Sequence, residues 1–120
     1  MAHRIEKTED LIEVHLWGDA HLTEVLTVLR KLHALTPRKE ISDLWLIAEE
    51  YVVPWATFST IVKAVTHLLG RDMVMAKSAI VVANEFQVAQ ASMYQEAAHH
   101  LPFKVGVFRN RDAAVQWLKT

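Results

Sequence analysis

Short apolar runs of strand length alternate with helical stripes along this chain, and that alternation constrains its fold more than any other feature. The clearest unit is the last one, residues 103–120. There a short apolar strand leads into a polar turn at Arg109-Asn110-Arg111, and a helix follows with its apolar positions on one face. Strand runs have a period of two or are continuous, whereas helical stripes recur every three or four residues. Repetition of such units predicts an α/β fold.

Nine elements are expected in the order β-β-α-β-α-β-α-β-α. The strands are predicted at 4–7, 11–17, 41–48 and 78–83, with the last one before Arg109; the helices are predicted at 21–35, 54–69, 85–100 and after Arg111. The polar stretch at 8–10 is short enough to make the first two strands an antiparallel hairpin. The later strands, each separated by a helix, form a mostly parallel sheet through right-handed crossovers, so only the N-terminal edge strand runs antiparallel.

Individual residues support these boundaries. Pro54 suits a first helical position, and Asn84 can cap the helix that follows it. In that helix the apolar positions are Phe86, Ala89, Met93 and Ala97. Gly106 stands inside the last strand, which predicts a close approach of a neighbouring element to the backbone.

Size and composition exclude several classes of protein. A chain of 120 residues fits one domain, residues 1–120, and 52% hydrophobic with 22% charged residues indicates a globular protein. No apolar run approaches the roughly 20 residues that cross a bilayer, and the N-terminus lacks the pattern of a signal peptide, so a cytoplasmic protein without membrane insertion is expected. A formal charge of -1 argues against nucleic acid as a partner.

Metal and nucleotide sites are not predicted. The chain has no cysteine, and its seven histidines include no i, i+4 pair of the kind that holds a metal on a helix. The adjacent His99 and His100 are expected to contact carbonyl groups in the last turn of their helix instead. The three glycines belong to no phosphate-binding loop, so no cofactor is expected.

Ligands of open parallel sheets favour the carboxyl ends of the strands, which here select Asp19, Glu49, Glu50, Tyr51 and Arg109. Acid–base catalysis would use Glu49 or Glu50 as the base, with Asp19, His21 or Arg109 nearby, provided that one carboxylate is desolvated. Polar residues at strand–helix junctions more often cap helices, so a non-enzymatic role is favoured and no catalytic residue is assigned.

Aromatic residues gather around the third strand and the second helix. Trp45 and Phe58 are expected to pack in the core. Tyr51 and Trp55 flank Val52-Val53-Pro54 in a connection expected to be accessible at the surface, which makes them candidates for an apolar groove or a subunit contact.

The hairpin start, Val53-Pro54-Trp55, and the ending Val107-Phe108-Arg109 with Ala113-Ala114-Val115-Gln116-Trp117-Leu118 together resemble the SpoIIAA-like family. That family is related to the STAS domains of bacterial anti-sigma factor antagonists. The resemblance covers nearly the whole chain and implies the fold deduced above. In the antagonists a serine between the third strand and the second helix is phosphorylated, whereas the matching stretch here, 48–55, has no serine or threonine. The nearest candidate phosphosites are the hydroxyls of Thr57 and Ser59.

These observations predict a regulatory domain that binds another protein, a second copy of itself as a homodimer, or an apolar small molecule. Tyr51 and Trp55 are the central candidates. A carrier of a small molecule or lipid is an alternative, and it requires an apolar cavity between the second helix and the sheet.

Overall fold

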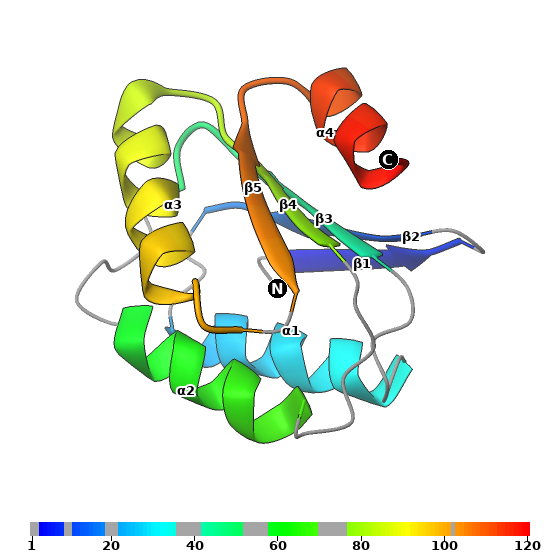
Figure 1. Ribbon diagram of the computed structural model, residues 1–120, viewed down its shortest axis with the longest axis vertical. Helices are drawn as coiled ribbons and strands as arrows, with labels where there is room; N and C mark the ends of the chain where they lie inside the picture. The colour runs from blue at the N-terminus through cyan, green and yellow to red at the C-terminus, as the bar shows by residue number, and fades with distance from the viewer. Residues whose placement is uncertain are drawn as a thin grey trace.

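The computed structural model describes residues 3–8, 11–18, 22–35, 42–51, 58–69, 77–101 and 103–120 (Figure 1). The strands are β1 (His3–Lys7), β2 (Leu11–Leu16), β3 (Ser42–Ile47), β4 (Lys77–Val81) and β5 (Lys104–Phe108); the helices are α1 (Leu22–Leu35), α2 (Phe58–Leu69), α3 (Glu85–Ala97) and α4 (Arg111–Leu118). Their order along the chain is the predicted one. None of these helices is long and apolar enough to cross a membrane.

The strands form one sheet in the order β1-β2-β3-β4-β5. β1 pairs with β2 antiparallel, and β2 to β5 are parallel, which confirms the predicted sheet. Each crossover from β2 onward advances one strand in the same direction, so the right-handed rule places α1, α2 and α3 on one face. α4 follows the last strand and lies on the opposite face (Figure 1).

The face under α1 to α3 holds most of the core. In β2 the side chains of Ile12, Val14 and Leu16 alternate inward and are buried. They pack against Val28 and Leu32 of α1, while Val25 of the same helix joins a second cluster with α2 and the segment after α3. One helix therefore contacts both the sheet and its neighbouring helix.

On the opposite face, α4 packs over β3, β4 and β5. Leu44, Ala79 and Ala114 are fully buried there. Gly106 leaves room for aromatic rings, since a Cβ atom at this position would lie 2.8 Å from Cε2 of Phe108 and 3.1 Å from Cη2 of Trp117. The predicted close approach to Gly106 is therefore made by aromatic side chains of its own strand and of α4.

The buried face of α3 does not coincide with its apolar positions. Phe86 is 59% exposed, Met93 is 44% exposed and Ala89 is also exposed. The buried residues of the helix are Gln87, Gln90 and Ala91. Apolar positions do not mark the buried face here because the side chain of Gln87 finds hydrogen-bond partners inside the protein, which offsets the cost of burying it.

Two boundaries also shift. β4 spans Lys77–Val81 instead of 78–83, because the chain turns at residues 83–84, where Asn84 caps α3 by accepting a hydrogen bond from the Gln87 amide. The predicted start of the second helix at Pro54 lies outside the described residues, and α2 is described from Phe58.

Candidate functional site

A cavity of about 130 Å³ lies between the sheet and the three helices α1, α2 and α3. The three crossovers bring its walls together from distant parts of the chain. Apolar side chains dominate the lining: Ile12 and Leu16 of β2, Val25 and Leu29 of α1, Ile61 and Val65 of α2, Ile80 of β4, Val82 and Ala91 beyond it, and Phe103 before β5. The alternative role as a carrier required an apolar cavity between the second helix and the sheet, and the structure has a cavity at this place.

The sheet contributes a carboxylate to the cavity. Asp43 of β3 and Ser78 of β4 are register partners, and both are buried and line the cavity. The Ser78 hydroxyl donates a hydrogen bond to Oδ1 of Asp43, and the Trp45 indole Nε1 donates to the same oxygen over 3.1 Å. These bonds offset part of the cost of burying a charged group in apolar surroundings. Asp43 also affects Tyr94 of α3, whose pKa is raised first by burial and second by the Asp43 charge.

Two other polar atoms of the lining have no hydrogen-bond partner in the described part of the chain. They are the hydroxyl of Tyr51 and Nδ1 of His33, and both atoms are buried. Buried polar atoms in native proteins almost always have a partner, so an unpaired one calls for an explanation. Because both residues line the cavity, these two atoms are candidates for pairing with a molecule held there.

Tyr51 is buried, although the sequence placed it in an accessible connection. It is 1% exposed and packs against Ile12, Val14 and Leu16 of β2 and Val28 and Leu32 of α1. Burial, and secondarily the charge of Glu24, raises the pKa of its phenol to about 12. The prediction of surface exposure was wrong because a large aromatic ring gains more by covering the open side of the β2–α1 core than by facing water.

The inward-facing Gln87 fixes the chain that carries Tyr51. Its side-chain Nε2 donates to the carbonyl oxygens of Ala48 (2.7 Å), Glu49 (3.2 Å) and Tyr51 (2.9 Å). Its Oε1 accepts from the amide of Ala83 over 2.8 Å. One glutamine thus joins the end of β3 to the start of α3, and it positions Tyr51 at the carboxyl end of the sheet.

The carboxylate of Glu24 lies in a short polar chain between α1 and β1. The Lys31 ammonium contacts Nε2 of His3 over 3.0 Å, and Nδ1 of His3 contacts Oε1 of Glu24 over 2.6 Å. An ammonium can only donate, so Nε2 accepts, and Nδ1 carries the proton and donates to Glu24. The buried His3 therefore connects the side chains of Lys31 and Glu24, which both belong to α1.

Other predicted site residues have structural contacts or lie outside the described chain. Glu49 and Glu50 are exposed, and the carboxylate of Glu50 accepts from the Gly18 amide over 3.3 Å. Arg109 donates through Nη2 to the Ala83 carbonyl over 3.4 Å. Asp19, His21, Trp55 and Thr57 lie outside the described residues, and of Ser59 only the helical backbone is described.

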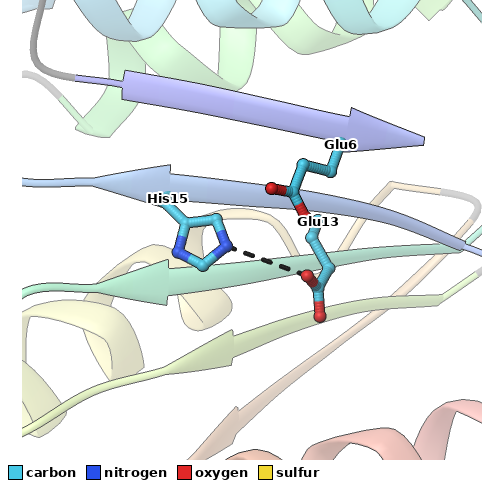
Figure 2. Close-up of side chains that lie close together, drawn as sticks. All are labelled: Glu6, Glu13 and His15. Atoms are coloured by element: carbon cyan, nitrogen blue, oxygen red, sulfur yellow. Dashed lines mark ion pairs between the residues drawn. The ribbon is translucent and has the colours of Figure 1, made fainter.

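The outer face of the β1–β2 hairpin gathers Glu6, Glu13 and His15, whose potential ligand atoms all lie within 4.8 Å of one another (Figure 2). Glu6 and Glu13 are register partners, and Nε2 of His15 is 3.8 Å from Oε2 of Glu13. Arginines already contact both carboxylates: Nε of Arg111 donates to Glu13 over 3.1 Å, and Nε of Arg4 is 3.1 Å from Glu6. We assign this group as an ion-pair network. Pairing between β1 and β2 brings its residues together, so a search for i, i+4 spacing on helices could not find it.

Of the two histidines at the end of α3, His99 makes the predicted contact with a carbonyl group of the last turn. Nδ1 of His99 contacts the Glu96 carbonyl over 2.7 Å, which satisfies an acceptor of the last turn. The His99 and His100 rings meet edge to face, with centroids 5.9 Å apart.

Sequence reasoning missed the polar groups of the cavity, namely Asp43, Ser78, His33, Gln90 and Tyr94. One signal was present: Asp43 interrupts an otherwise apolar strand, and a carboxylate in such a run must be buried with partners or mark a site. The other residues gave no such signal, because their proximity depends on how three helices cross one sheet.

Comparison with known proteins supports the fold. No family model and no curated protein matches the sequence. A solved structure does match: an uncharacterized protein of the DUF3478 family with a SpoIIAA-like fold, from Shewanella loihica PV-4. It is 18% identical to this chain, with a TM-score of 0.61 over 98% of this chain and 92% of that one. The likeness at this identity concerns the architecture, and the chain therefore has the SpoIIAA-like fold that its sequence pattern predicted.

Proposed function

We propose that this domain binds a small apolar molecule in the cavity between the sheet and helices α1 to α3. The observation that carries the proposal is an apolar cavity whose lining includes the buried and unpaired hydroxyl of Tyr51. Binding sites for small molecules combine such apolar walls with a few polar groups that fix orientation.

The size of the cavity suits a single ring. Apolar cavities of about 150 Å³ in other protein cores accommodate benzene. At about 24 cal/mol for each Å³, the 130 Å³ found here would cost roughly 3 kcal/mol relative to a core filled by side chains. That is a large share of the 5 to 15 kcal/mol by which proteins are stable, so a cavity of this size favours a role in binding.

Acid–base catalysis finds less support than binding. The enzymatic alternative required a desolvated carboxylate at Glu49 or Glu50, and both residues are exposed. Gln87 also holds the carbonyl of Glu49 in a structural contact. The function we propose therefore needs no reacting group.

The first experiment is native mass spectrometry of protein purified from its own host. We expect a retained molecule of low mass on the folded chain. The same spectrum would reveal a phosphate on Thr57 or Ser59, which would instead support the regulatory switch of the antagonists.

A titration with benzene tests the site directly, using methyl NMR signals. Signals of the lining residues Leu29 and Ile80 should shift with benzene concentration, whereas those of Leu35, which is exposed at the end of α1, should not. No retained molecule, together with no shift at Leu29 or Ile80 up to the solubility of benzene, would refute the proposal.

Self-association is a second candidate, favoured by the outward face of α3. Phe86 and Met93 are both exposed and stand two helical turns apart, so they lie on the same side of the helix. A second copy of the chain could cover this pair in a symmetric dimer. Trp55 remains a candidate for such a contact. Sedimentation of wild type and of a Phe86→Ser, Met93→Ser variant tests it: a dimer that the variant loses supports it, and a monomeric wild type refutes it.

A further inference from the structure

The charges and hydrogen-bonding groups around the cavity restrict what it can hold. Resting on the function proposed above, we infer that the ligand is an uncharged, ring-sized molecule with one polar group, which pairs with the hydroxyl of Tyr51. A phenol or a cyclic alcohol or ketone has this chemistry, and a fatty acid or an aromatic carboxylate does not.

The lining selects against anions. Among the described residues that line the cavity, none is a lysine or an arginine, whereas Asp43 contributes a carboxylate. A second carboxylate, that of Glu24, is close enough to Tyr51 to raise the pKa of its phenol. An anionic ligand would lose its hydration without finding a lysine or an arginine as a partner, and these two carboxylates would repel it.

The hydroxyl of Tyr51 supplies the polar contact. A phenol both donates and accepts, so it can pair with a hydroxyl or with a carbonyl. Its proton stays in place at neutral pH, because the ordinary pKa of a phenol, 10.0, already lies well above that range and burial raises it further. No internal partner competes for it within the described chain. A ligand can therefore pair with this hydroxyl without breaking a hydrogen bond of the described chain.

Register places this contact away from the buried carboxylate. Tyr51 follows the carboxyl end of β3, next to the paired residues Leu16 and Ile47. Asp43 is near the amino end of the same strand, four residues before Ile47, which corresponds to about 13 Å of extended chain. A ring at the carboxyl end would thus contact apolar side chains, with its polar atom turned to Tyr51.

The test compares three probes of similar size: benzene, phenol and benzoate at pH 7. Phenol should bind about fivefold more tightly than benzene, because one ordinary hydrogen bond contributes about 1 kcal/mol to the free energy of binding. Benzoate should bind at least about 100-fold more weakly than phenol, because its charge would have to be buried. Tyr51→Phe keeps the ring and should make phenol and benzene equal. Tyr94→Phe removes the other phenolic hydroxyl of the lining and should leave the phenol preference unchanged.

The possible outcomes test the proposed binding function and the inferred class of ligand separately. If none of the probes binds, both the function and this inference fail. If benzene binds but benzoate binds as tightly as phenol, the cavity is a binding site and the inferred selection against anions is wrong. If Tyr51→Phe keeps the preference for phenol and His33→Leu loses it, the polar contact belongs to His33, and the assignment to Tyr51 is overturned.

Discussion

Filling the cavity should stabilise the protein while it removes binding, and Ala91→Leu is the substitution best placed to show this. Ala91 lies on the buried side of α3 and lines the cavity. Leucine adds three carbon atoms, worth about 0.8 kcal/mol each on burial, or about 2.4 kcal/mol in total. Subtracting about 0.5 to 1 kcal/mol for lost rotamer freedom leaves a gain of roughly 1.5 kcal/mol.

Urea denaturation followed by tryptophan fluorescence measures this gain as a higher free energy of unfolding. A rise in melting temperature of about 6 °C should accompany it for a chain of this length. The matched control is Ala89→Leu, two residues earlier on the exposed side of the same helix, which should change stability by less than about 0.5 kcal/mol.

Benzene binding provides the second readout, and Ala91→Leu should abolish it while Ala89→Leu retains it. Val65→Leu fills the same space from α2 and serves as an independent check if Ala91→Leu does not fold. If both Ala91→Leu and Val65→Leu lower the free energy of unfolding by more than about 1 kcal/mol, as overpacked cores do, the cavity has no room for the added atoms and the reasoning is refuted.

Two further predictions concern packing and pH. Gly106→Ala should destabilise the protein by about 1 to 3 kcal/mol in urea denaturation, because its Cβ atom would press on the Phe108 and Trp117 rings; an unchanged unfolding curve would contradict the observed packing. The raised pKa of Tyr51 means that the folded state holds the phenol proton more tightly than the unfolded state. The stability it contributes is complete below pH 10.0 and is lost as the pH rises towards about 12. Tyr51→Phe should lose less stability than wild type across that window, with Tyr94 causing part of the remaining loss, and equal losses would refute the assignment.

The order of elements could be predicted because it depends on local pattern. Continuous apolar runs such as that of β3 and the stripe of α1 are long enough to distinguish a strand from a helix. The face of α3 could not be predicted in the same way. Hydrophobicity alone would bury Phe86 and Met93, and both are exposed. The fold instead buries Gln87, because its side-chain amide donates hydrogen bonds to carbonyl groups 36 to 39 residues earlier in the chain.

The cavity lay beyond sequence reasoning for a different reason. It is the space left between side chains of three helices and a sheet, and no segment of the chain encodes that space alone. Tyr51 was singled out from the sequence as an aromatic residue in a connection; it lines the cavity, and its role in binding stays a prediction. Its burial could not be foreseen, since it depends on the ring covering β2 and α1.

The contacts of Gln87 also have a consequence for folding. One amide group with two hydrogens serves three carbonyls at the end of β3, and it can do so only after α3 has docked. Compact intermediates that form β2, α1 and β3 without α3 would leave Tyr51 unanchored. The protein would then bind phenol only after the last step of refolding. Bound phenol would therefore indicate that the native state has formed, because earlier collapsed states would not bind it.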